Sequence, residues 1–161
     1  MKLNIVILGS TGSIGKTTFS ILKKNKQLFN IQLLSTNKNI NELIKQSKIF
    51  NVKNLIITDK SKFLIAKKKL KNKKINIFND FNCFNKIFKN KADYTMSSIS
   101  GLDGLEPTLN IIRFSKKIAI ANKESIICAW NLIKKEITKY KTIFIPIDSE
   151  HFSIWSLLND S

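Results

Sequence analysis

The first residues able to do chemistry form the glycine-rich stretch GSTGSIG at residues 9–15. The apolar run at residues 3–8 precedes it and predicts a buried parallel strand. Residues 16–24 follow with apolar side chains at Phe19, Ile21 and Leu22, which are expected to form one buried face of a helix, and Ser13 is its expected N-cap. A strand-to-helix turn of this kind directs free backbone N–H groups and a helix N-terminus at one point. The stretch therefore predicts an anion site suited to phosphate.

Two kinds of phosphate-binding loop fit these residues. The spacing G-x-x-G-x-x-G is a variant of the dinucleotide fingerprint. Gly15-Lys16-Thr17 also ends as a P-loop does, but a P-loop needs a glycine where this chain has Ser10. A P-loop-type nucleotide-binding protein and a turn that binds nothing are the alternatives. The expected strand and helix on either side favour the dinucleotide interpretation.

The end of the expected second strand, residues 31–35, bears on the choice of cofactor. An NAD enzyme usually carries an acidic residue about 20 residues after the glycine loop, where it accepts a hydrogen bond from the ribose 2′-hydroxyl. Residues 35–39 read Ser-Thr-Asn-Lys-Asn and contain no acid, while Lys38 is cationic. The lysine would attract a 2′-phosphate, which a carboxylate would repel, so the sequence favours NADP. The alternative is that Lys38 is an ordinary surface lysine.

Polar residues follow the expected sixth strand. Asn122, Lys123 and Glu124 stand in a row there. Lys123 could bind a phosphate or a carbonyl oxygen, and the two neighbours could orient a cofactor or the hydroxyl groups of a substrate. Equally, Asn122 could be the N-cap of the next helix, with Glu124 complementing the helix dipole in its first turn.

A second polar block follows the expected seventh strand. Asp148 and Glu150 are two residues apart, so on an extended backbone they project to the same side. Two carboxylates suit Mg²⁺ or Mn²⁺. The alternative is a helix that begins at Ser149, capped by Asp148.

Strands and helices are expected to alternate along the whole chain. This order is typical of a doubly wound α/β fold with a parallel sheet, of the Rossmann-like NAD(P)-binding kind. In that architecture ligands bind at the carboxyl ends of the strands. The expected strands are residues 3–8, 31–35, 54–58, 75–78, 93–97, 117–121 and 142–147, and the expected helices are residues 16–24, 41–50, 61–70, 83–89, 105–114 and 124–140.

The composition limits the possible partners. The chain has 161 residues, of which 43% are hydrophobic, which excludes a disordered protein, and no run is long enough to span a membrane. The formal charge is +17, yet 27 of the 28 basic residues are lysines scattered along the chain, so we expect no specific nucleic-acid binding. Cys83 and Cys128 have no metal-binding spacing and suit a reducing cytoplasm.

Taken together, three blocks give the chain a resemblance to the 1-deoxy-D-xylulose 5-phosphate reductoisomerase family. They are GSTGSIG at 9–15, ANKES at 121–125 and PIDSEH at 146–151. The resemblance implies isomerisation of 1-deoxy-D-xylulose 5-phosphate, followed by NADPH-dependent reduction to 2-C-methyl-D-erythritol 4-phosphate in isoprenoid precursor biosynthesis. It also implies Mg²⁺ or Mn²⁺, a sugar phosphate substrate and a homodimer for the full-length enzyme. Another NADP-dependent oxidoreductase is the alternative.

The resemblance also assigns roles to residues. It implies cofactor contacts for Thr11, Gly12, Ser13, Ile14, Lys38, Asn39, Asn122 and Glu124. It implies substrate contacts for Lys123, Ser149 and Glu150, metal ligation by Asp148 and Glu150, and catalytic roles for Lys123, Asp148 and Glu150. A bound metal would polarise the ketone and stabilise the developing oxyanion during rearrangement.

Two departures from the family pattern affect these expectations. Asn37 stands where the family often has glycine, so the 2′-phosphate loop is expected to differ in detail. The chain also stops at Ser161, soon after the second carboxylate. We therefore expect an NADPH-binding domain at residues 1–147, and the beginning of a truncated catalytic domain at residues 148–161. Such a fragment is expected to be inactive on its own.

Overall fold

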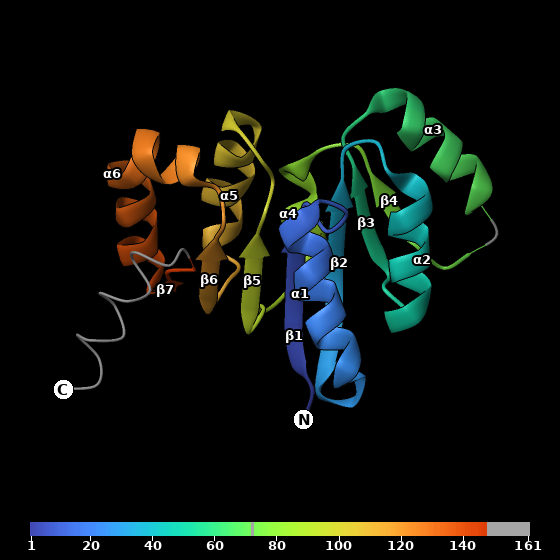
Figure 1. The fold of residues 1–161 in the computed structure, drawn as a ribbon, viewed down its shortest axis with the longest axis horizontal. Coiled ribbons are helices and arrows are strands. Elements are labelled where there is room, and N and C mark those ends of the chain that lie inside the picture. The colour runs from blue at the N-terminus through green and yellow to red at the C-terminus, as the bar shows by residue number, and fades with distance from the viewer. Residues whose placement is uncertain (72, 148–161) are drawn as a thin grey trace.

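The computed structural model describes residues 1–71 and 73–147, which form a parallel seven-stranded sheet between two layers of helices (Figure 1). The strand order is β4-β3-β2-β1-β5-β6-β7. The strands are β1 (Leu3–Leu8), β2 (Phe29–Thr36), β3 (Asn54–Ile57), β4 (Asn76–Phe78), β5 (Tyr94–Ser97), β6 (Lys117–Ile120) and β7 (Ile143–Ile145). The predicted doubly wound parallel fold is confirmed.

An α-helix connects each strand to the next, and three of these connections also contain a short 3-10 helix. They are α1 (Ser13–Lys24), α2 (Ile40–Phe50), α3 (Lys60–Lys69), α4 (Phe84–Ile87), α5 (Leu105–Ile112) and α6 (Lys123–Tyr140). The 3-10 helices are η1 (Lys26–Leu28), η2 (Phe81–Cys83) and η3 (Leu102–Gly104). Among the described residues, none of these helices is both long and apolar enough to cross a membrane.

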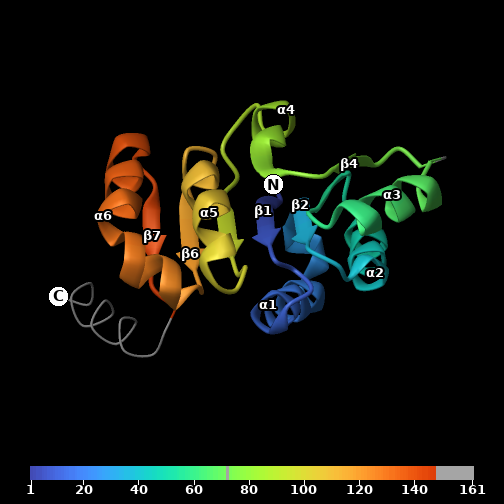
Figure 2. The ribbon, with the colours of Figure 1, turned by 90° about the horizontal axis from the view of Figure 1, so that it is seen from above.

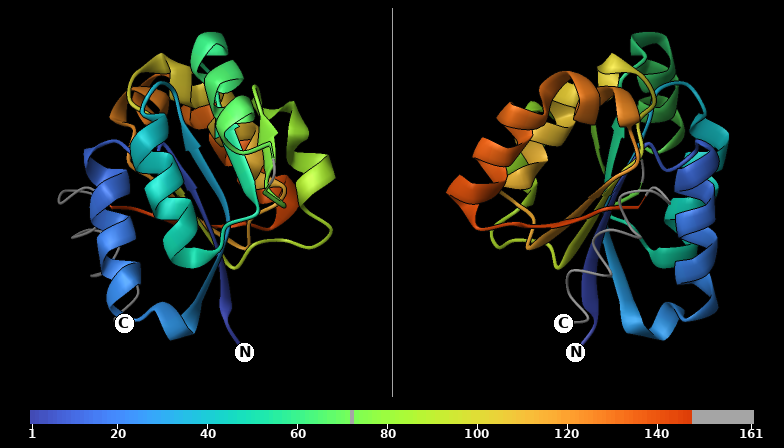
Figure 3. Two further views of the ribbon diagram at one scale, coloured as in Figure 1. Left: turned by 90° about the vertical axis from the view of Figure 1, so that its right-hand side faces the viewer. Right: turned by 60° about the vertical axis from the view of Figure 1, so that its left-hand side comes forward.

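Each face of the sheet buries its own apolar core, because successive side chains of a strand point to opposite faces. On β1, Ile5 and Ile7 pack under α1, α2 and α3, while Val6 and Leu8 pack under α4, α5 and α6. Figure 2 shows α1 and α2 on one side of β1 and β2 and α4 on the other. The right-hand view of Figure 3 shows the same two layers, with the blue and cyan helices facing the orange ones across the strands.

Two details of the helices differ from the sequence-based expectation. The first helix was expected to bury Ile21 together with Phe19 and Leu22, but Ile21 is 60% exposed and only its two neighbours enter the core. The single helix expected at residues 83–89 is instead η2 followed by α4. It begins earlier because the Asp80 carboxylate accepts a hydrogen bond from the Asn82 N–H.

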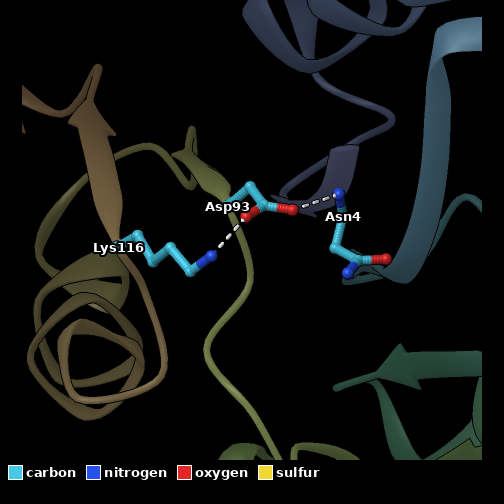
Figure 4. Close-up of polar contacts among 3 residues, drawn as sticks. All are labelled: Asn4, Asp93 and Lys116. Atoms are coloured by element: carbon cyan, nitrogen blue, oxygen red, sulfur yellow. Dashed lines mark hydrogen bonds and ion pairs between the residues drawn. The ribbon is translucent and has the colours of Figure 1, made fainter. Parts of the chain in front are cut away.

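At the amino ends of the strands, Asp93 joins three of them (Figure 4). One carboxylate oxygen accepts the backbone N–H of Asn4, at the start of β1, at 2.8 Å. The other accepts Lys116 Nζ, just before β6, at 2.8 Å. The hydrogen bond from Lys116, and then that from Asn4, hold the pKa of Asp93 below its ordinary value.

We expect the Asp93→Ala variant to lose about 1 kcal/mol of folding stability at pH 7, because it leaves the Asn4 N–H unpaired and removes a partly exposed ion pair. The folded-state pKa is lowered, so this contribution is complete above the unfolded value of about 3.9 and disappears as the pH falls through the folded value. Urea unfolding at pH 7 and at a series of pH values below about 3.9 measures this difference. Lys116→Met removes only the ion pair and should cost less; a variant difference that does not shrink as the pH falls would contradict the argument.

Candidate functional site

A cleft of about 830 Å³ opens at the carboxyl ends of the strands. It lies above β1, whose neighbours in the sheet are β2 and β5, so the chain changes winding direction there. This switch point is where open parallel sheets bind ligands. The lining residues come from the glycine loop, from the segments after β2, β3, β4 and β5, and from the start of α5.

The glycine loop is tied to the end of β2. The Gly9 N–H donates to Ser35 Oγ at 2.8 Å, and the Ser10 N–H donates to the Ser35 carbonyl oxygen at 2.9 Å. The hydroxyl groups of Thr11 and Thr36 are 2.6 Å apart and share a hydrogen bond. The loop is therefore held in one conformation before any ligand arrives.

Two of the loop glycines are required by the geometry. Gly9 has φ +76°, and a Cβ there would lie 2.7 Å from the Ser98 carbonyl oxygen. Gly15 lies in the first turn of α1, packed directly on the backbone of Gly9 and Ser10. These contacts bring helix and strand close together, as a phosphate-binding turn requires.

The N-terminus of α1 faces the ligand side without a side-chain cap. The helix begins at Ser13, and its N-cap is Gly12, so the expectation that Ser13 is the N-cap was wrong by one residue. A glycine cap offers no side-chain oxygen, and the first turn contains no acidic residue. The N–H groups of this turn and the positive end of the helix dipole are therefore available to an anion.

The turn after β2 matches what a 2′-phosphate needs. Lys38 and Asn39 both line the cleft and are exposed. Asn39 also caps α2, because its Oδ1 accepts the Glu42 N–H at 3.2 Å. Asn37 donates from Nδ2 to Thr58 Oγ1 at 2.8 Å, which joins this turn to the turn after β3.

Sequence reasoning missed several residues around this turn. Asp59 follows the cleft residue Thr58; hydrogen bonds from Ser61 and Lys62 lower its pKa, and the charge of Lys38 adds to the effect. Other lining residues that the sequence analysis did not single out are Phe81, Ser98, Ile99, Leu102, Asp103, Glu106 and Pro107. The two acids among them form no recognisable motif in the sequence.

The block after β6 is built around Asn122. Its side chain is buried: Oδ1 accepts the Ser125 N–H at 3.0 Å, and Nδ2 donates to the carbonyl oxygens of Ile99 and Gly101. Lys123 and Glu124 are exposed in the first turn of α6.

The structure brings some of the predicted site residues to the cleft and not others. Those that line it are Thr11, Gly12, Lys38 and Asn39, and Ser13 and Ile14 are exposed beside it. Asn122, Lys123 and Glu124 are not among its lining residues. Cofactor or substrate contact by the latter group stays a prediction.

The predicted metal ligands lie outside the described residues. Asp148, Ser149 and Glu150 belong to residues 148–161. Within the described part of the chain, no group of three or more histidine, cysteine, aspartate or glutamate side chains could hold a metal ion. The metal site therefore stays a prediction.

Comparison with known proteins agrees with this geometry. The family model for 1-deoxy-D-xylulose 5-phosphate reductoisomerase matches residues 5–130, which is most of the chain. The chain belongs to this family. The match favours the dinucleotide interpretation of the glycine loop over the P-loop interpretation, because the family model includes that loop.

Relatives and solved structures show how far the likeness extends. The reductoisomerase of Pelagibacter ubique (strain HTCC1062) is 62% identical over 159 residues, which is 98% of this chain and 41% of that protein. The enzyme from Zymomonas mobilis in complex with NADPH has a TM-score of 0.85 and 32% identity, and the match covers 94% of this chain and 40% of that one. A reductoisomerase in complex with NADPH, fosmidomycin and magnesium gives a TM-score of 0.84 and 27% identity, with 92% and 37% covered. The chain thus spans about two fifths of the length of these relatives.

Proposed function

We propose that this chain is the NADPH-binding part of a 1-deoxy-D-xylulose 5-phosphate reductoisomerase. The observation that carries the proposal is the uncapped N-terminus of α1, which opens on a cleft whose β2 end offers Lys38 in place of a carboxylate. Membership of the family supports it, as do the two similar reductoisomerase structures that were solved in complex with NADPH. Bound NADPH would supply the hydride for the reduction step.

The residues at hand have separate tasks in this proposal. The backbone of Thr11 and Gly12 and the first turn of α1 would bind the pyrophosphate, since N–H groups and a helix N-terminus favour negative charge. Lys38 would pair with the 2′-phosphate, and Asn39 would hold that turn against α2. Asn122 would support the cofactor indirectly through the turn at 98–101, while Lys123 and Glu124 would contact substrate and cofactor.

The full-length enzyme would carry out the two-step conversion of 1-deoxy-D-xylulose 5-phosphate to 2-C-methyl-D-erythritol 4-phosphate as a homodimer. Asp148 and Glu150 would bind Mg²⁺ or Mn²⁺, and Ser149 and Glu150 would contact the substrate. We propose the cytoplasm as its location, which the free thiols of Cys83 and Cys128 support. No specific nucleic-acid partner belongs to the proposal.

The test is calorimetric binding of NADPH, NADH and ATP to this chain at physiological salt. We expect saturable NADPH binding at least about tenfold tighter than NADH binding, a factor that one ion pair to the 2′-phosphate can supply. Physiological salt matters because a chain of charge +17 attracts any polyphosphate at low ionic strength.

The control variant is Lys38→Met, which keeps much of the side-chain length and removes the charge. It should weaken NADPH binding toward the NADH value and leave NADH binding unchanged. Lys45→Met, on the exposed surface of α2 away from the cleft, should change neither. Tighter binding of ATP than of NADPH would contradict the proposal and favour a P-loop function.

A further inference from the structure

We infer that Gln46, a residue outside the cleft, is a positioning residue that holds the glycine loop in its cofactor-binding form. The inference rests on the proposed cofactor function of that loop. Gln46 lies in the second turn of α2, is 1% exposed, and does not line the cleft. It therefore acts through the loop, not by touching the cofactor.

The contact that carries the inference joins residues 36 positions apart. Gln46 Nε2 donates to the carbonyl oxygen of Ser10 at 3.0 Å, in a buried hydrogen bond. The Ser10 carbonyl and the Thr11 N–H belong to one planar trans peptide, so they point in opposite directions. Holding the carbonyl toward α2 therefore fixes the direction of the Thr11 N–H, and Thr11 lines the cleft.

The other hydrogen bonds of Ser10 leave this task to Gln46. The Ser10 N–H and hydroxyl both donate to the carbonyl oxygen of Ser35, which fixes the residue on its amino side. Gln46 donates to its carbonyl, on the side that leads to Thr11 and Gly12. Without the Gln46 donor, that peptide is free to rotate away from the orientation that serves a phosphate.

A neighbouring carboxylate sets the orientation of the Gln46 amide. Gln46 Nε2 also donates to Glu42 Oε1, one turn earlier in α2, at 3.2 Å. The reverse amide orientation would place an oxygen against both the Glu42 carboxylate and the Ser10 carbonyl, and both are acceptors. Glu42 thus keeps the donor aimed at the loop.

This arrangement lowers stability at Gln46 itself. Gln46 Oε1 is buried and has no hydrogen-bond partner among the described residues. Replacing Gln46 by an apolar side chain of similar size removes this unpaired acceptor but leaves the buried Ser10 carbonyl without its donor, so the two effects on folding stability oppose each other. A merely structural role would change stability alone, whereas a positioning role changes loop exchange and cofactor affinity, and this difference makes the role testable.

The experiment compares the Gln46→Leu variant with the parent chain. We expect NADPH affinity to fall about tenfold, the factor that corresponds to about 1.4 kcal/mol. NADH affinity should fall by the same factor, because the loop binds the pyrophosphate that both cofactors share. Without cofactor, amide hydrogen exchange at residues 11–15 should become faster, while the melting temperature changes little, because the two effects on stability oppose each other.

Gln32→Leu is the matched control. Gln32 lies on β2, does not line the cleft, and likewise has a buried Oε1 without a partner among the described residues. Its replacement should leave loop exchange and both affinities unchanged. Gln46→Met serves as a second test if the leucine variant packs poorly, because methionine is unbranched and adaptable.

Each outcome decides one of the two claims. Parent-like affinity and parent-like loop exchange in a folded Gln46→Leu or Gln46→Met variant would overturn the positioning role. If the parent chain itself does not bind NADPH, the proposed function fails. The hydrogen exchange of residues 11–15, which needs no cofactor, would still decide the role of Gln46.

Discussion

The Gly15→Ala variant is expected to bind NADPH at least about a hundredfold more weakly than the parent chain and to lose about 3 kcal/mol of stability. A Cβ at Gly15 would lie against the carbonyl oxygen of Gly9, 2.6 Å from the Cα of Ser10 and 2.8 Å from its carbonyl carbon. All three obstacles are backbone atoms, so no side-chain rotation relieves the clash. The glycine loop or the first turn of α1 must move instead.

Thermal unfolding and calorimetric binding measure this prediction together. A loss of about 3 kcal/mol lowers the melting temperature of a domain of this size by roughly 6–12 °C. Gly12→Ala is the matched control, because Gly12 has φ −75° and a Cβ there would meet its first neighbour at 3.4 Å. That variant should lose much less stability than the Gly15 variant, since alanine is only a poorer N-cap than glycine, and should weaken NADPH binding only through the methyl group that it adds to the cleft wall. Equal melting temperatures for the Gly15 variant and the parent chain would contradict the packing argument.

The contrast between these glycines shows what the sequence can and cannot predict. The spacing of the loop glycines, with an apolar strand before them and a helix after them, is local information and placed the strand-to-helix turn correctly. The distance from Gly15 to Ser10 is set by how α1 packs on β1, which no local pattern records. The sequence therefore predicted where the turn lies but not which glycine is indispensable.

Contacts between distant residues account for most of what was missed. The hydrogen bond between Gln46 and Ser10 joins residues 36 positions apart, and the hydrogen bond between Asp93 and Asn4 joins residues 89 positions apart. Each depends on strand register and on where a helix crosses the sheet, and the sequence fixes these only through the whole fold. Ile21 has the apolar character of a core residue, but the helical repeat places it away from the face that Phe19 and Leu22 share, and it is 60% exposed.

Asn122 is the second position where we expect substitution to have a large effect on stability. From the sequence alone, two roles were open for its side chain. A helix N-cap and a cofactor contact both call for an amide at a strand end. In the structure Asn122 is 3% exposed, and its side chain is committed to three partners: the Ser125 N–H, the Ile99 carbonyl and the Gly101 carbonyl. Both N–H groups of the amide are directed at the turn after β5, which lines the cleft. The capping role is therefore confirmed, and the amide also supports a wall of the site.

The Asn122→Ala variant is expected to lose about 3 kcal/mol of stability, because it removes a cap worth about 1 kcal/mol and the donors to two carbonyl groups in a part-buried turn. Asn122→Asp keeps the capping oxygen but places a second acceptor against those carbonyls, so it should lose a similar amount. Asn39→Ala, which removes an exposed cap of α2, should lose only about 1 kcal/mol. Urea unfolding of the three variants measures these values. If Asn122→Asp were as stable as the parent chain, the cap alone would explain Asn122, and the turn at 98–101 would not depend on its amide.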